Sequence, residues 1–433
     1  MRFWLKLGFI SFGGPAGQIA IMHTELVERR RWISERRFLH ALNFCMLLPG
    51  PEAQQLATYI GWLLHRRRGG LAAGALFVLP SLVILIVLSW IYLRFGQVPV
   101  VAGVFYGIKP AVTALVLHAA YRIGTRALGN GWMWAIAGAA FIALFAFNVP
   151  FPAIVLAAAA IGAIGARVAP HVFAPGGSHS DASGGYGPAL IDDDTPPPPH
   201  ARFSHRRLVR ALAIGLALWL LAMAALVAAD GPEGALTAMA WFFSKAALVT
   251  FGGAYAALPY VYQGGVEQHH WLSAGQMIDG LALGETTPGP LIMVVAFVGF
   301  VGGWTVQVLG PDALFAGAAL AASVVTFFTF LPSFVFILAG GPLVEATHGR
   351  IGFTAPLAAI TAAVVGVILD LAVFFAWHVL WPQGLGGRFD AVSAAIVVAA
   401  AVALFRFRAG VLPLLGACAV LGLVATWVAP SLH

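Results

Sequence analysis

Charged residues are scarce in this sequence. Asp, Glu, Lys and Arg together make up 9% of its 433 residues, against roughly 25% in an average soluble domain. So few charges could not cover the surface of a protein in water, whereas a bilayer accepts an apolar exterior if backbone polar groups are satisfied internally. The composition therefore excludes a soluble globular protein and predicts an integral membrane protein.

Motifs of enzymes and metal sites are also missing. The sequence has no zinc-protease motif, no phosphate-binding loop and no dinucleotide fingerprint. Its two cysteines, Cys45 and Cys418, lie far apart in apolar segments, which favours neither a disulfide framework nor a zinc site. We therefore expect no enzymatic activity, no cofactor and no bound metal.

The net charge is +7, which in a soluble protein would suggest a nucleic-acid partner. In a membrane protein the same arginines are explained by cytoplasmic loops, which are enriched in Lys and Arg. We therefore expect the lipid bilayer, and no nucleic acid, as the surroundings of the chain.

Apolar runs of helical length recur along nearly the whole sequence, where an outer-membrane barrel would have short alternating strands. This pattern predicts an all-α polytopic membrane protein. The segments are at about 3–22, 38–64, 71–93, 99–121, 132–148, 151–166, 208–229, 236–262, 276–302, 314–340, 354–378, 391–405 and 411–429.

The composition divides the chain into two halves. Residues 169–207 are rich in Gly, Ser, Asp and Pro, which form neither a packed core nor a membrane span, and we expect them to be a disordered cytoplasmic linker. The first half is 1–168 and the second is 236–433. The extra transmembrane segment 208–229 has no equivalent in either half, so this single crossing would invert the second half relative to the first.

The two halves repeat one another in sequence. Phe12-Gly13-Gly14 recurs 239 residues later as Phe251-Gly252-Gly253, and Pro49-Gly50-Pro51 recurs at the same offset as Pro288-Gly289-Pro290. Over positions 3 to 51 this offset gives 13 identities without a gap. Leu79-Pro80-Ser81 recurs as Leu331-Pro332-Ser333 at an offset of 252. Internal duplication is typical of secondary transporters, whose substrate lies between the repeats.

The arginines constrain the topology. Five arginines within residues 29–37 precede segment 38–64, and Arg66, Arg67 and Arg68 follow it. One full crossing there would therefore leave a strongly basic loop outside. We therefore expect 38–64 to be a re-entrant hairpin broken at Pro49-Gly50-Pro51, and 3–22 to be broken in the same way. The fold prediction is an inverted-topology tandem repeat with broken helices, a cytoplasmic N-terminus and a periplasmic C-terminus. The competing model has 13 full crossings.

The only three lysines, Lys6, Lys109 and Lys245, all lie in apolar segments. An ammonium at the bilayer centre costs about 2.5–3.5 kcal/mol, so it normally faces a partner or a water-filled path. Lys6 and Lys245 are equivalent in the repeat, which favours a role in an anion pathway. The alternatives are snorkelling of Lys6 to the interface and pairing of a lysine with a buried acid.

The Gly and Pro breaks are the second candidate for chemistry. A helix that begins after a break presents free N–H groups and a positive dipole end, which suit a small oxyanion. The alternative is that Gly and Pro only allow close helix packing. The candidate substrate-binding residues are Lys6, Ser11, Phe12, Gly13, Gly14, Pro15, Gln18, Pro49, Gly50, Pro51, Glu52, Gln54, Gln55, Lys109, Lys245, Thr250, Gly252, Gly253, Glu285, Thr286, Thr287, Pro288, Gly289 and Pro290.

Acidic residues within the apolar segments are candidates for moving protons. Glu285 lies just before the second-half break, and Asp370 lies at the repeat position of His118. We expect Asp370 or Glu285 to be a proton-coupling group, with a structural ion pair as the alternative for each.

Four motifs carry a resemblance to a known family: Phe12-Gly13-Gly14-Pro15-Ala16-Gly17-Gln18, Leu48-Pro49-Gly50-Pro51-Glu52-Ala53-Gln54-Gln55-Leu56-Ala57, Gly107-Ile108-Lys109-Pro110-Ala111 and Thr287-Pro288-Gly289-Pro290. With them the sequence resembles the chromate ion transporter family in its long two-domain form. The resemblance implies proton-driven export of chromate across the bacterial inner membrane and chromate resistance, with sulfate as a related oxyanion.

Other functions stay open at this point. An uptake transporter or channel for sulfate-like oxyanions has the same sequence features, because inverted repeats do not fix the direction of transport. A membrane enzyme or sensor is the third class. The oligomeric state, a homodimer included, is also open.

Overall fold

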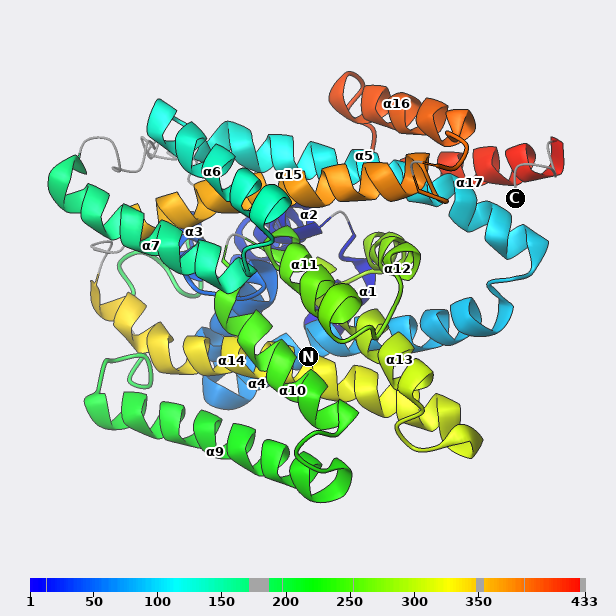
Figure 1. Cartoon of the computed structure of the whole chain (residues 1–433). Coiled ribbons are helices and arrows are strands. Elements are labelled where there is room, and N and C mark those ends of the chain that lie inside the picture. The colour runs from blue at the N-terminus through cyan, green and yellow to red at the C-terminus, as the bar shows by residue number, and fades with distance from the viewer. Residues whose placement is uncertain are drawn as a thin grey trace.

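The computed structural model describes residues 1–12, 14–170, 187–196, 198–251, 253–347, 354–384 and 386–428. These residues are almost entirely helical, and the described part contains no strand beyond an isolated bridge between Ile33 and Ile191. Seven described helices are long and apolar enough to cross a membrane, and four shorter apolar helices accompany them. The chain is thus an all-α polytopic membrane protein, as the composition predicts (Figure 1).

The first half consists of helices joined by short turns. Its elements are α1 Arg2–Ile10, α2 Gly14–His23, a π-helical turn Thr24–Arg29, α3 Glu35–Leu47, α4 Glu52–Phe95, α5 Pro99–Ala127, α6 Gly131–Phe147 and α7 Phe151–Val168.

The second half follows the helix α9, His205–Asp230. Its elements are α10 Ala235–Val249, α11 Ala254–Tyr262, a π-helical turn Gln263–Gln268, α12 Ala274–Thr286, a 3-10 turn Leu291–Met293, α13 Val294–Val306, a 3-10 turn Pro311–Ala313, α14 Leu314–Thr347, α15 Thr354–Leu380, α16 Ala391–Phe405 and α17 Val411–Val428.

The same local structure occurs twice. The π-helical turns begin at Thr24 and Gln263, which are 239 residues apart, and α3 and α12 begin at that same offset. Ser34 and Ser273 cap these two helices, each accepting a backbone N–H three residues on. The sequence repeat is therefore a repeat of helices, turns and caps.

The long helix α4 is a hairpin of two arms. His65 (φ −134°, ψ 31°) and Arg66 (φ 57°, ψ −155°) interrupt it. Gly61 on the first arm lies against Gly69 and Ala73 on the second, so close that a methyl group would not fit. The first arm ends where the predicted segment 38–64 ends.

Equivalent helices of the two halves run antiparallel. Gly74 on α4 lies against Phe334 of α14, while Trp90, further along α4, packs 6.1 Å from Phe315, which lies earlier in α14. Helices of one half also pack against helices of the other half: α5 packs on α16 and α17, and α15 packs on α6 and α7. Figure 1 shows α15 beside α5 and α6. Antiparallel equivalents are what an inverted repeat requires, and the orientation in the membrane stays a prediction.

Part of the linker differs from the sequence expectation. Residues 171–186 and Pro197 lie outside the described residues, but Leu190 and Ile191 bond to the backbone of Arg31 and Trp32 at 2.8 and 3.1 Å. The side chain of Ile191 is 6% exposed. This part of the linker is docked on the first half rather than disordered, because its backbone finds hydrogen-bond partners that composition alone does not reveal.

The topology is tested with single cysteines at Arg29 and Gln268, which are equivalent in the repeat and both exposed. In a background without Cys45 and Cys418, both buried, a membrane-impermeant maleimide should label Arg29→Cys only from the cytoplasmic side and Gln268→Cys only from the periplasmic side. Labelling of both from one side would contradict the inverted topology.

Candidate functional site

The breaks of one half meet the breaks of the other half at two junctions. At the first, the Gly50 N–H donates to the Thr250 carbonyl at 2.8 Å; at the second, the Gly289 N–H donates to the Ser11 carbonyl at 2.9 Å. Gly50 and Gly289 are equivalent in the repeat, as are Ser11 and Thr250. The same hydrogen bond therefore occurs twice, once with the first half as donor and once with the second half as donor. This indicates a two-fold relation between the halves.

The two glycines at the junctions are required by the backbone and by their neighbours. Gly50 has φ +121° and Gly289 has φ +108°, conformations that residues with a Cβ rarely adopt. Gly50 lies directly against Ser333, and Gly289 against Ser81. These two serines belong to the repeated Leu-Pro-Ser motif, so the sequence held a signal for them that was not assigned to the site.

Polar side chains gather at the first junction. Gln54, Gln55 and Ser333 have no exposed surface. The amide of Gln55 donates to the Pro49 carbonyl at 2.8 Å, and that of Gln54 to the Thr58 hydroxyl at 3.0 Å. The remaining amide oxygens and the Ser333 hydroxyl have no hydrogen-bond partner among the described residues.

Such unpaired buried groups are costly, at about 1–3 kcal/mol each. They favour a polar occupant, water or an anion, between the helices. An amide offers donors as well as an acceptor, and turning its side chain presents the NH₂ group to a bound anion. The first junction can therefore bind an oxyanion, although its side chains are closed to solvent in this conformation.

The second junction has fewer polar side chains. Gln18 donates to the Gly289 carbonyl at 2.5 Å, and the Ser11 hydroxyl donates to the Leu7 carbonyl. At the repeat positions of Gln54 and Gln55 the second half has Met293 and Val294. The helix breaks are thus symmetric, whereas the amide side chains come from the first half alone.

Two carboxylates flank the breaks. A Glu52 carboxylate oxygen lies 3.7 Å from the position a Cβ would take on Gly253, and Glu285, 5% exposed, accepts a hydrogen bond from the Tyr255 hydroxyl. Arg126 lies within electrostatic range of Glu52, and Arg122 within range of Glu285.

Other predicted site residues are occupied by local contacts. The Thr286 and Thr287 hydroxyls donate to the helix carbonyls of Ala282 and Leu283, at 3.1 and 2.6 Å. The Thr250 hydroxyl likewise donates to the Ala246 carbonyl at 2.6 Å. The breaks place Phe12, Gly14, Pro15, Pro49, Pro51, Pro288 and Pro290 at or next to the junctions. Gly13 and Gly252 lie outside the described residues.

The lysines do not meet at the junctions. Lys6 and Lys245 are exposed on α1 and α10, and the Lys245 ammonium lies 5.8 Å from the centre of the Trp241 ring. In this conformation both side chains are exposed, and the role predicted for the pair in an anion pathway stays a prediction. On α1 the buried residues Phe3, Trp4, Leu7 and Gly8 share one side of the helix, so the spacing of its apolar residues does indicate that Lys6 faces outward.

Lys109 and Asp370 lie away from the breaks. Lys109 forms an ion pair with Asp279 at 3.3 Å, and Tyr92 donates to the same carboxylate at 2.8 Å. Because Asp279 is 3% exposed, this pair neutralises a buried charge. Asp370 lies within electrostatic range of Glu267.

A duplicated bundle of membrane helices, broken where its halves meet and carrying buried polar groups there, is the architecture of membrane transporters. The family model described as chromate transporter matches residues 1–163 and 237–423. The chain belongs to the chromate transporter family.

Relatives of two lengths match the chain. It is 36% identical to a chromate transport protein of Pseudomonas aeruginosa over 383 residues, covering 85% of this chain and 79% of that protein. It is 28% identical to one of Cupriavidus metallidurans, covering 100% and 93%. An uncharacterized transporter of Bacillus subtilis is 32% identical over 162 residues, which are 37% of this chain and 90% of the relative. No solved structure matches the chain.

The junction geometry predicts the effect of a methyl group at Gly289. Gly289→Ala should lower the stability of the purified protein by about 1–3 kcal/mol, because alanine is strained at φ +108° and its Cβ would overlap Ser81. The measurement is the thermal unfolding midpoint. Gly416→Ala, on α17 with open space around it, is the matched control. Equal midpoints for the two variants would contradict the role of this glycine.

Proposed function

We propose that this chain is a secondary active transporter that exports chromate across the inner membrane, is driven by the proton gradient, and thereby confers chromate resistance. The cytoplasmic N-terminus and periplasmic C-terminus belong to the same proposal. The names of the two long relatives support the substrate. The single observation that carries the mechanism is the reciprocal pair of junctions.

The first junction is the proposed binding site. A chromate dianion leaving water needs several donors and compensating positive charge. The amides of Gln54 and Gln55 and the Ser333 hydroxyl offer the donors, and the N-terminus of α4 begins there, with its positive dipole end. Arg126, which is exposed, lies within electrostatic range of Glu52 and offsets the charge of that carboxylate.

The two-fold arrangement supports alternating access. In this conformation Gly50 and Gly289 both hold carbonyls of the opposite half, and the polar side chains are closed to solvent. Separating the halves on one side would open one junction while the equivalent contact on the other side holds. Two such states face opposite sides of the membrane, which is what a carrier needs.

Uptake of a sulfate-like oxyanion, or a channel for one, is the second candidate. The first junction supports it equally, because sulfate is also a tetrahedral dianion. Everted vesicles separate the three cases. An imposed gradient, acidic inside, should drive accumulation of chromate by an exporter; an importer would empty such vesicles, and a channel would only equilibrate the anion.

The site is tested by comparing Gln55→Met with Lys245→Gln in proteoliposomes. Loss of one hydrogen bond to a charged ligand is worth about 1.5–3 kcal/mol, so Gln55→Met should raise the apparent KM for chromate roughly 10- to 150-fold. Lys245→Gln should leave it within about twofold, since Lys245 is exposed. A raised KM in Lys245→Gln alone would contradict the first junction as the binding site and would favour a site at the lysine pair.

Proton coupling is tested at Glu285 and Asp370. A carboxylate that carries the coupling proton cannot be replaced by an amide, so Glu285→Gln or Asp370→Asn should abolish gradient-driven accumulation of chromate while counterflow exchange continues. Both fluxes are measured in the same everted vesicles. Full gradient-driven transport by both variants would exclude the two residues as coupling groups.

A further inference from the structure

A second polar site lies away from the junctions, at the turn of the α4 hairpin. The site is a cavity of about 570 Å³ between this turn, the start of α9, the end of α14 and the docked part of the linker. It is lined by Trp62, His65, Arg66, Arg67, Arg68, His200, Arg207, Arg210, Leu338 and Pro342. We call it the arginine pocket.

The charge of the arginine pocket is of one sign. Five of its ten lining residues are arginines, and among the described residues no carboxylate lines it. None of these five arginines forms an ion pair with a carboxylate of the described residues, whereas Arg29, Arg30 and Arg37 elsewhere on the same half all do. Gathering like charges without a counter-charge costs free energy, which a bound anion would remove.

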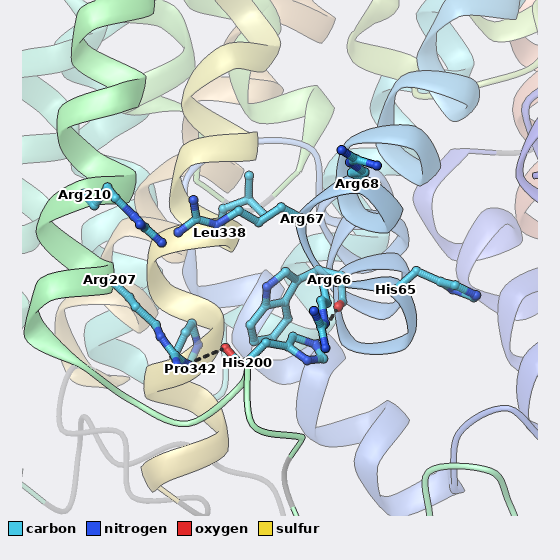
Figure 2. Close-up of a pocket in the computed structure, with 10 residues that line it drawn as sticks. His65, Arg66, Arg67, Arg68, His200, Arg207, Arg210, Leu338 and Pro342 are labelled. Carbon is cyan, nitrogen blue, oxygen red and sulfur yellow. Dashed lines mark hydrogen bonds between the residues drawn. The ribbon is translucent and has the colours of Figure 1, made fainter.

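The side chains in the pocket converge from separate elements. Figure 2 shows Arg67 of α4 and Arg210 of α9 pointing toward one another across Leu338 of α14, while Arg68 and His65 point away. Arg207 donates to the carbonyl of His200 at 3.3 Å, and His200 contacts the Trp62 carbonyl at 3.0 Å, so the linker closes one wall. A planar guanidinium donates two parallel hydrogen bonds to a tetrahedral oxyanion.

We propose that the arginine pocket binds a phosphate-type oxyanion, either free in solution or as the headgroup of an anionic lipid. This inference goes beyond the proposed transport function, because the pocket shares no residue with the junctions. Trp62, Leu338 and Pro342 give the pocket apolar walls, and α9 carries exposed apolar residues such as Leu216 and Leu221 directly beyond its arginines. A basic cluster at the end of an apolar helix is the setting in which lipid phosphates bind.

The test uses the full chain with two arginines removed. Arg67→Gln/Arg210→Gln is compared with Arg406→Gln/Arg408→Gln, which removes the same charge from exposed positions after α16. In phosphatidylcholine nanodiscs, sulfate or inorganic phosphate is titrated and the thermal unfolding midpoint is followed. In a second arm, phosphatidylglycerol retained by the purified protein is counted by native mass spectrometry.

We expect the wild-type protein to be stabilised by the free anion or to retain phosphatidylglycerol. Which of the two occurs shows whether the bound oxyanion is free in solution or belongs to a lipid headgroup. In the pocket variant the stabilisation by the anion should need at least a tenfold higher anion concentration, or the retained phosphatidylglycerol should fall at least tenfold. In the Arg406/Arg408 control either quantity should change by less than twofold. Arg67→Lys/Arg210→Lys keeps the charge but loses the planar forks, so it should fold as wild type and give an intermediate loss.

Gln55→Met separates this site from the junctions. A sulfate effect lost in Gln55→Met and kept in the pocket variant would belong to the first junction and would overturn the arginine pocket as its source. The proposal is also overturned if neither the free anions nor the lipid distinguishes wild type from the pocket variant, or if the control loses as much. None of these readouts depends on chromate transport, so the two proposals fail independently.

Discussion

A broken helix in a membrane leaves backbone groups that lipid cannot satisfy, and the rest of this structure depends on how they are paired. Each half supplies the partner for the other: Gly50 donates to Thr250, and Gly289 donates to Ser11. Neither break is complete within its own half. Any motion that opens a junction must therefore supply water or a ligand to the freed groups, which links movement of the halves to occupation of the site.

The scaffold is symmetric but its chemistry is not. Equivalent glycines and serines build both junctions, whereas the repeat positions of Gln54 and Gln55 are occupied by Met293 and Val294 in the second half. A scaffold with two-fold symmetry gives two equivalent conformations, and polar side chains at one junction are enough to hold one anion.

Features encoded locally were predictable from the sequence. Apolar runs predict the helices, and Gly and Pro mark the breaks after Ile10 and Leu47, because these signals do not depend on distant residues. The outward position of Lys6 could have been predicted, since the apolar residues of α1 gather on the other side of the helix. That of Lys245 was harder to predict, because most residues of α10 are apolar and its inner side is set by packing. The contact of Ser81 with Gly289 joins residues of different halves. Its one sequence signal was the repeated Leu-Pro-Ser motif.

The helix α9 lies between the two halves of the chain, and we propose that it allows them to run in opposite directions. It is mostly exposed and contacts the bundle at few points, including Trp219, which donates to Ser244 at 2.8 Å, and Gly215 against Val335. Such a helix adds little to the core. Because α4 and α14 run antiparallel, a chain with an even number of crossings per half needs one further crossing before the second half begins. We therefore propose that α9 serves chiefly to set the orientation of the second half. In the proposed topology the arginines at its start lie at the cytoplasmic surface, where positive charge is favoured.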